Sequence, residues 1–230
     1  MINLNLTKPI ISLDEVLRYL GYNGQDISSQ LMDNIKSCID KVISICTPRC
    51  VCSEFDILHN KDGINLKNTS LILPGKDINK LLNNCKSCYI FAATIGSEID
   101  RVLSYYQNID MAKAVIMDAA ATAGIEALCD DIQNQLESIA KKRNLLITWR
   151  FSCGYGDLPI NLQPQILSIL NAQKLTGITC SSSNIMLPQK SVTAIIGLTD
   201  IKNNGINITC ETCRFNESCN LRKAGKSCGC

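Results

Sequence analysis

The longest element that the sequence predicts is a helix from about Met111 to Arg143, and the rest of the fold has to accommodate it. Apolar residues recur along this segment at helical spacing. Its first half is rich in alanine and other small residues, which let a helix approach its neighbours closely. We therefore expect this helix to pack tightly against other elements.

Two shorter helices are predicted near the N-terminus. The first starts at a capping box formed by Ser12 and Glu15 and stops near Gly21. The second has apolar residues at helical spacing over residues 31–46, and Pro48 marks its end. Two cysteines lie on its apolar face and are predicted to be core residues, namely Cys38 and Cys46.

Strands and further helices follow one another without a regular alternation. Strand-like runs are expected at residues 51–73 (short strands with an Asp62-Gly63 turn), 89–93, 145–151, near 178 and at 192–198. One helix is expected to begin after Ser97, which would cap it, and another is expected over residues 165–174. This mixture predicts an α+β fold, with long helices packed on a mixed or antiparallel sheet. We expect this domain to cover residues 1–205 and a cysteine-rich tail to cover residues 206–230.

The composition argues against several classes of protein. A hydrophobic fraction of 46% is typical of globular chains. A net charge of +2 with only 5% aromatic residues does not suit a nucleic-acid-binding surface. No signal peptide and no run of apolar residues long enough to cross a membrane is found. We therefore expect a cytoplasmic protein whose 14 cysteines are free thiols or metal ligands rather than disulfides.

The most informative segment runs from Arg150 to Asp157 and reads Arg-Phe-Ser-Cys-Gly-Tyr-Gly-Asp. The guanidinium of Arg150 can hold a carboxylate through two parallel hydrogen bonds. Gly154 and Gly156 permit backbone conformations that other residues avoid, and Tyr155 offers a flat face and a hydroxyl. These features suit a small ligand with a carboxylate and a flat, bulky part. Alternatively, the segment is a strand-end turn with a salt-bridged arginine and a half-buried tyrosine.

A polar strip lies on the long helix, where Asp118, Thr122 and Glu126 stand among small and apolar residues. Spacing by four keeps the three on one side of the helix. A carboxylate buried in such surroundings is costly unless it is paired, so an amino group or a bound cation would be its partner. Alternatively, the strip faces water.

The pattern Arg150-x-x-x-Gly154-Tyr155 resembles the S-adenosylmethionine-binding motif in the activation domain of cobalamin-dependent methionine synthase. Residues 182–193 (Ser-Ser-Asn-Ile-Met-Leu-Pro-Gln-Lys-Ser-Val-Thr) are similar to a second signature of that family. The two segments occur in the family's order, at a comparable spacing and with a helix between them. The resemblance covers about residues 90–200.

The resemblance implies a role for each residue of the motif. Arg150 would hold the carboxylate of S-adenosylmethionine, and Tyr155 would lie between this ligand and a corrin ring. Glu126 is the best match for an acidic residue at the ligand's amino group, and Asp118 is a further candidate. Backbone groups that would line the site belong to Phe151, Ser152, Cys153 and Gly154.

The resemblance also implies a cofactor and partners. In this family an oxidised corrinoid takes one electron and then a methyl group from S-adenosylmethionine, and no catalytic side chain is required. We expect cobalamin or another corrinoid to be carried by a separate methyltransferase subunit, and a flavodoxin or ferredoxin-like protein to supply electrons. The sequence departs from the family after Tyr155, because residues 156–161 lack the usual histidine and the single histidine is His59.

A cluster of cysteines near the C-terminus is a candidate metal site, comprising Cys210, Cys213, Cys219, Cys228 and Cys230. A Cys-x2-Cys pair with further cysteines nearby can bind zinc or an iron–sulfur cluster. Free-standing relatives of the activation domain resemble this chain in having such a tail. Our hypothesis is an iron–sulfur cluster that relays an electron to cobalt, and the alternative is an unliganded tail. The pair Cys85-x2-Cys88 leads into a predicted buried strand and is interpreted as structural.

Two functions of different classes remain open at this stage. One is an S-adenosylmethionine-binding factor that reactivates a corrinoid on a methionine synthase-like methyltransferase. The other is a non-catalytic metal-binding or adaptor protein that retains the fold. The intact motif Arg150, Gly154 and Tyr155 favours the first, because an adaptor would not need it.

Overall fold

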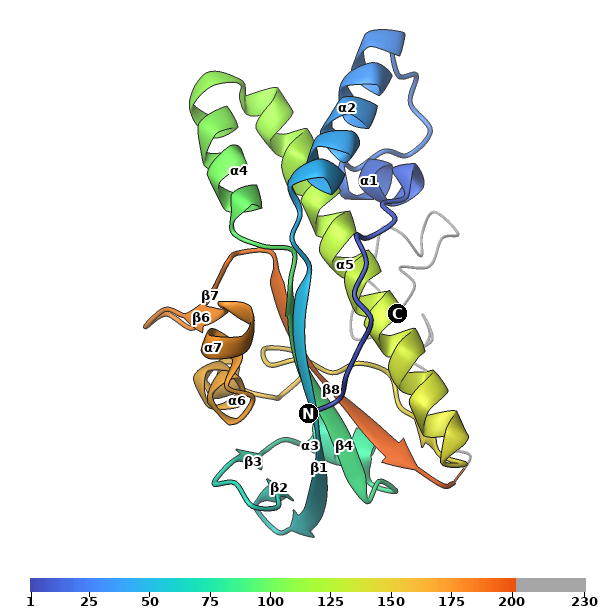
Figure 1. Ribbon diagram of the computed structural model, residues 1–230, viewed down its shortest axis with the longest axis vertical. Coiled ribbons are helices and arrows are strands. Elements are labelled where there is room, and N and C mark those ends of the chain that lie inside the picture. Colours follow the sequence, from blue (N-terminus) through green and yellow to red (C-terminus); the bar gives the residue numbers. More distant parts are fainter. Residues whose placement is uncertain (202–230) are drawn as a thin grey trace.

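The computed structural model describes residues 1–201 as a six-stranded sheet with helices on both of its faces (Figure 1). The strand order is β3-β2-β1-β4-β8-β5, and every pairing is antiparallel. The strands are β1 (Arg49–Asn60), β2 (Gly63–Leu66), β3 (Ile72–Leu73), β4 (Ser87–Thr94), β5 (Leu146–Ile147) and β8 (Ser191–Thr199). The predicted α+β class is confirmed.

The helices divide between the two faces of the sheet according to the apolar cluster that each one joins. One face carries α1 (Leu13–Tyr19), α2 (Ser29–Ile45), α4 (Glu98–Ile109) and α5 (Met111–Lys142). The other face carries α3 (Lys76–Leu82), α6 (Gln163–Ile169) and α7 (Ala172–Thr176), with a short 3-10 turn (Ile160–Leu162) before α6. Figure 1 shows α2, α4 and α5 extending well beyond the end of the sheet.

Strand β4 is the centre of the fold, and all eight of its residues are buried. Side chains alternate along it, so that Tyr89 and Phe91 join the cluster under α5 while Ile90 and Ala92 join the cluster under α6. A strand that is covered on both faces reads as a continuous apolar run rather than an alternating one. This explains why the sequence predicted this strand correctly.

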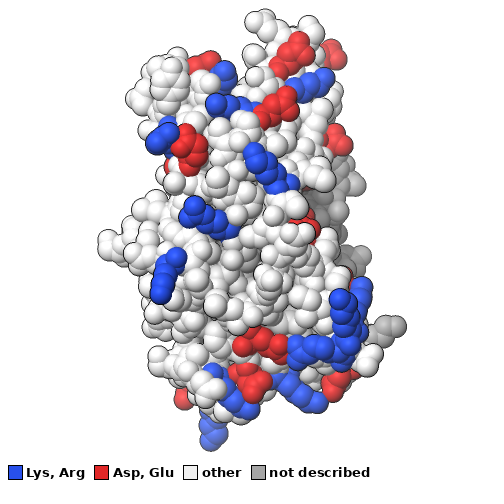
Figure 2. Space-filling model, in the orientation of Figure 1, with Lys and Arg blue, Asp and Glu red and all other residues white. Residues whose placement is uncertain are grey.

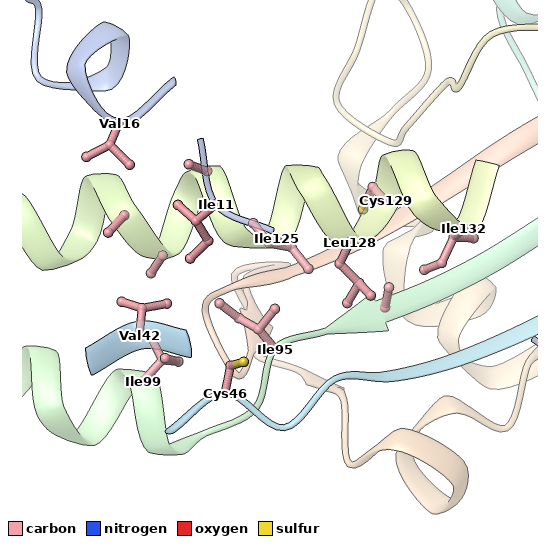
Figure 3. Packing of buried hydrophobic residues seen from close by; sticks show 14 of the residues in the cluster. Ile11, Val16, Val42, Cys46, Ile95, Ile99, Ile125, Leu128, Cys129 and Ile132 are labelled. Carbon is pink, nitrogen blue, oxygen red and sulfur yellow. The ribbon is translucent and has the colours of Figure 1, made fainter. Parts of the chain in front are cut away.

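Helix α5 contributes many of the buried side chains of the larger apolar cluster. Figure 3 shows side chains of α5, including Ile125, Leu128 and Ile132, packed among residues from the N-terminal segment, α1, α2, α4 and the loop between β4 and α4. The helix approaches the N-terminal segment closely, since a Cβ atom on Gly124 would lie 3.2 Å from Cδ1 of Ile11. The expectation of close packing by small residues is therefore confirmed.

The C-terminal end of α5 is tied to the sheet by an ion pair. Arg143 donates two hydrogen bonds to the carboxylate of Glu54 on β1, at 2.6 and 2.9 Å. Ser87 of β4 donates to the same carboxylate at 2.9 Å. These bonds fix the last turn of the long helix over β1 and β4.

Two helix starts differ from the sequence prediction. Ser12 precedes α1, but its side chain makes no capping hydrogen bond, and Glu15 instead pairs with Arg18 at 2.6 Å. Ser97 precedes α4, but its backbone is already helical, so its hydroxyl does not cap the helix. Side chains that do cap helices include Ser28, which accepts a hydrogen bond from the backbone N–H of Leu31, and Asp110, which accepts one from the backbone N–H of Lys113.

Several strand and helix boundaries also differ from the prediction. Residues 49–60 form one long strand rather than short ones. The strand predicted at 145–151 is reduced to β5 and an isolated bridge between Phe151 and Ile195, because Thr148 accepts the Gly197 N–H through its hydroxyl. The helix predicted at 165–174 is divided by Asn171, whose φ is 53°.

The segment near residue 178 lies outside the main sheet. It forms β6 (Thr179–Cys180), which pairs with β7 (Met186–Leu187) as a small hairpin. Figure 1 shows this hairpin beside α7, on the side of the molecule away from α5.

Charged side chains of both signs are interspersed on the face seen in Figure 2, with wide uncharged areas between them. In residues 1–201 no helix is long and apolar enough to cross a membrane. The predicted tail at 206–230 lies outside the described residues.

Candidate functional site

Two basic side chains face the polar strip of α5. Arg150 lies 2.7 Å from the carboxylate of Asp130 and 3.5 Å from that of Glu126. Lys190, just before β8, lies 2.7 Å from the carboxylate of Asp118 and donates a 2.8 Å hydrogen bond to Thr122. The strip is half-exposed, and its partners are basic side chains of the chain itself.

Residues 149–151 have an extended backbone, which turns the side chain of Arg150 towards α5. Its neighbours Trp149 and Phe151 pack into the cluster on the opposite face of the sheet. Phe151 exchanges backbone hydrogen bonds with Ile195 at 2.8 and 3.0 Å, and Ser152 donates from its hydroxyl to the carbonyl of Thr193 at 2.7 Å. Because successive side chains of an extended segment point to opposite sides, these contacts leave Arg150 facing the acidic residues of α5.

The loop after Arg150 is anchored to α3 by Asp157. Its carboxylate accepts hydrogen bonds from the backbone N–H groups of Lys76 and Asp77, at 2.6 and 3.1 Å. Burial alone would raise the pKa of Asp157, but these hydrogen bonds outweigh it and hold the pKa below its ordinary value. The carboxylate of Asp157, in the segment after Tyr155, therefore caps α3.

Both glycines of the loop adopt positive φ, 85° at Gly154 and 56° at Gly156. A Cβ atom on Gly156 would lie 2.6 Å from the carboxylate of Asp77. The predicted need for glycine at these positions is confirmed, and at Gly156 it follows from the contact between the loop and α3.

Tyr155 stands on the other side of this segment from Arg150. Its ring makes edge contacts with Phe151 and Trp149, with ring centroids 5.4 and 6.0 Å apart, and the residue is 42% exposed. Neighbouring Cys153 is partly buried, and burial raises its pKa to about 12. The structure thus brings Arg150 and Glu126 together and places Tyr155 with Phe151 and Trp149, on the opposite side of the segment.

The sequence matches no family model, and no curated protein matches it either. Among solved structures, it is similar to the crystal structure of the MetH reactivation domain bound to AdoHcy. The TM-score is 0.61 at 15% sequence identity, over 81% of this chain and 73% of that chain. This chain has the fold of the MetH reactivation domain. The expectation drawn from the two sequence motifs is confirmed at the level of the fold.

Two residues of the site, Asp130 and Lys190, were not predicted from the sequence. Asp130 follows Glu126 by four residues, so it continues the spacing of the polar strip and could have been found from that spacing. Lys190 gave no comparable signal, because its contact with Asp118 joins segments far apart in the sequence.

Tyr19 of α1 interacts electrostatically with Glu126 of the polar strip. Burial is the main cause that raises the pKa of Tyr19, and the negative charge of Glu126 adds to it. The side chain of Arg18 lies over the ring of Tyr19, 4.3 Å from its centroid.

The predicted metal ligands Cys210, Cys213, Cys219, Cys228 and Cys230 lie outside the described residues. Within residues 1–201, no group of three or more histidine, cysteine or acidic side chains is arranged to hold a metal. Cys85 and Cys88 are buried, and burial raises the pKa of Cys85 to about 11. Cys38 and Cys46 are buried as well, which confirms them as core residues.

Proposed function

We propose that this protein binds S-adenosylmethionine and supports the reductive remethylation of an oxidised corrinoid on a separate, methionine synthase-like methyltransferase. The observation that carries the proposal is the position of Arg150 beside Glu126, in a fold that a solved reactivation domain shows bound to AdoHcy. These are the two residues for which the family resemblance implies contacts with the ligand's carboxylate and amino groups.

The charges of this pair suit the amino acid part of the ligand. Arg150 offers N–H donors to a carboxylate, and Glu126 offers an acceptor to an ammonium group. Their side chains are 23% and 45% exposed, so both are accessible to a ligand. An ion pair of this exposure contributes at most about 1 kcal/mol, so a ligand can displace it at little cost.

The acidic side chains of α5 also suit a positively charged ligand. Bound S-adenosylmethionine would supply a methyl group on a cationic sulfur. Asp118, Glu126 and Asp130 lie along one side of the helix, and Lys190 and Arg150 only partly neutralise them. The role of these residues is to bind and orient the ligand, and the proposal assigns no proton transfer to them.

The remaining parts of the proposal concern groups beyond residues 1–201. The corrinoid, cobalamin or a related one, would be carried by the methyltransferase partner, and a flavodoxin or ferredoxin-like donor would supply the electron. An iron–sulfur cluster or zinc ion held by the C-terminal cysteines would complete the electron path or stabilise the tail. These assignments rest on the sequence resemblance.

The proposal is tested by calorimetric titration of the protein with AdoHcy and with S-adenosylmethionine. We expect Arg150→Ala to weaken both ligands at least about tenfold, because a charge-assisted hydrogen bond is worth about 1.5–3 kcal/mol. The matched control is Arg101→Ala, which removes an exposed arginine paired with Glu98 on α4. Binding that is equal in the Arg150→Ala variant and the wild type, or no binding at all, would contradict the proposal and favour the adaptor function.

A further inference from the structure

A cavity of about 270 Å³ lies at the start of α4, apart from the Arg150 site. Its walls come from the start of β1, the first turn of α4, the end of α7 and the β6–β7 hairpin. Figure 1 shows these parts of the chain meeting where the lower end of α4 stands above the hairpin and α7. Segments from four parts of the sequence therefore build one pocket.

The cavity has a positive side chain on one wall. Arg49, at the start of β1, is exposed, and its guanidinium lies against Gly177 at the end of α7. A Cβ atom on Gly177 would be 3.6 Å from Nη1 of Arg49. In residues 1–201 this guanidinium makes no ion pair or hydrogen bond, although Arg150 and the other arginines of that range each pair with a carboxylate.

A negative side chain stands on another wall. One carboxylate oxygen of Asp100, on α4, accepts a 2.8 Å hydrogen bond from the backbone N–H of Gln189. The second oxygen, Oδ1, is buried and has no hydrogen-bond partner in the part of the chain that the structure describes. A buried polar atom without a partner is costly, and such atoms are uncommon in folded proteins.

Arg49 and Asp100 do not neutralise one another, although both line this cavity. In residues 1–201 no ion pair joins these two side chains. A ligand carrying only a negative charge would meet Asp100, and one carrying only a positive charge would meet Arg49. A ligand with both charges on a short frame would satisfy both side chains.

We propose that this cavity binds a small zwitterion of the α-amino acid class, with its carboxylate at Arg49 and its ammonium group at Asp100. Hydroxyl groups of Thr47, Ser97 and Thr179 line the same space and offer further hydrogen bonds. Leu187 and Pro188 supply an apolar wall for a short side chain. The volume lies just below the range of drug-sized pockets and suits a ligand of this size.

Nuclear magnetic resonance titration of the ¹⁵N-labelled full chain tests this proposal. The probes are glycine, L-serine and L-methionine, with acetate and methylammonium as single-charge controls. We expect saturable shifts of the amide signals of Gly96, Ser97 and Gly177 with at least one amino acid, and binding at least tenfold weaker for either control ion.

Two substitutions connect the binding to the cavity. Arg49→Gln and Asp100→Asn should each weaken the amino acid at least tenfold, and Asp100→Asn keeps an oxygen for the Gln189 N–H. Arg101→Gln, on the same helix, and Arg150→Ala, at the other site, should leave this binding unchanged. Because Arg150→Ala affects only the S-adenosylmethionine site, failure of one proposal is distinguishable from failure of the other.

Three results would overturn the assignment. The first is the absence of saturable shifts with all three amino acids up to about 20 mM, a concentration that detects even millimolar affinity. The second is acetate or methylammonium binding as tightly as the amino acid. The third is unchanged binding in both Arg49→Gln and Asp100→Asn, with the overall spectrum confirming that both variants are folded.

Discussion

At the scale of single residues, the central feature is that Arg150 contacts two carboxylates, those of Glu126 and Asp130, which we expect to affect ligand binding differently. Glu126 lies at 3.5 Å and is the residue assigned to the ligand's amino group. Asp130 lies at 2.7 Å and would compete with the carboxylate of the proposed ligand for the same guanidinium. Neutralising the two carboxylates should therefore change ligand affinity in opposite directions.

Glu126→Gln should weaken AdoHcy about tenfold, because it removes a charged acceptor from the ammonium group. Asp130→Asn should leave the affinity unchanged or raise it by up to about fivefold, because an exposed ion pair contributes at most about 1 kcal/mol. Calorimetry on the two variants measures both effects. Equal losses in the two variants would show that Glu126 has no particular role and that only the summed negative charge matters.

Asp157 gives a prediction for stability. Asp157→Ala should lower the free energy of unfolding by about 1 kcal/mol near neutral pH, because it leaves the first N–H groups of α3 without their acceptor. The pKa of Asp157 is depressed in the folded state, so this stabilisation is present above the unfolded pKa of about 3.9. It is lost as the pH falls through the folded pKa.

Urea unfolding of the wild type and Asp157→Ala at neutral pH and at about pH 3 checks this dependence. The difference between the two proteins should shrink as the pH falls below the unfolded pKa and through the folded pKa, because the carboxylate then becomes protonated in both states. A difference that stays constant with pH would mean that the carboxylate's charge does not cause the effect.

Some roles of single residues were predictable and others were not. Arg150 and Glu126 could be singled out because a local motif and a helical spacing mark them. The capping role of Asp157 depends on α3, and the role of Lys190 depends on α5, both far away in the sequence. Contacts of this kind become visible only when the chain is folded.

At the scale of elements, the glycines of α5 and β8 differ in how much space surrounds them. A Cβ atom on Gly197 of β8 would lie 2.5 Å from Sγ of Cys85 and 2.6 Å from Cδ2 of Leu82. On Gly124 of α5 it would lie 3.2 Å from the flexible end of Ile11. Packed side chains leave no room for a Cβ atom at Gly197, whereas the side chain of Ile11 can move to make room for one at Gly124.

Gly197→Ala should therefore destabilise the fold by about 1–3 kcal/mol, the usual cost of overpacking. Gly124→Ala should change stability little or raise it by up to about 1 kcal/mol, because alanine is the better helix former. Chemical denaturation of both variants measures the two values. Gly197→Ala at wild-type stability would show that the side chains around β8 rearrange freely.

The elements that the sequence predicted well are those with a strong local pattern. Helix α5 and strand β4 agree with the prediction because their apolar spacing continues over many residues. The strand at 145–151 was predicted too long, since Thr148 interrupts it with a side-chain hydrogen bond to β8. The helix at 165–174 was predicted as one piece, because nothing nearby revealed the left-handed conformation of Asn171.

At the scale of the whole molecule, the class of the fold follows from the sequence but the order of its strands does not. Strand β8 inserts between β4 and β5, so the central pairing joins residues about one hundred positions apart. Pairing at this distance depends on which apolar faces meet in the folded chain, and a local pattern does not record it. The likeness to the MetH reactivation domain confirms the fold that the motifs led us to expect.

The C-terminal cysteines give a prediction for the whole chain. Protein purified without oxygen should contain iron, and Cys210→Ser together with Cys213→Ser should remove most of it. Cys180→Ser, which changes a partly buried thiol of β6, is the matched control. A colourless preparation without iron, measured by metal analysis, would rule out the iron–sulfur hypothesis, and zinc in its place would support a structural site.

The most direct test of the central claim is a crystal structure of the protein grown with AdoHcy. We predict that the ligand's carboxylate contacts Arg150 and its amino group contacts Glu126, with the loop of residues 151–155 along one side and the guanidinium released from Asp130. AdoHcy bound elsewhere on the molecule, with Arg150 still paired to Asp130 and Glu126, would contradict the account.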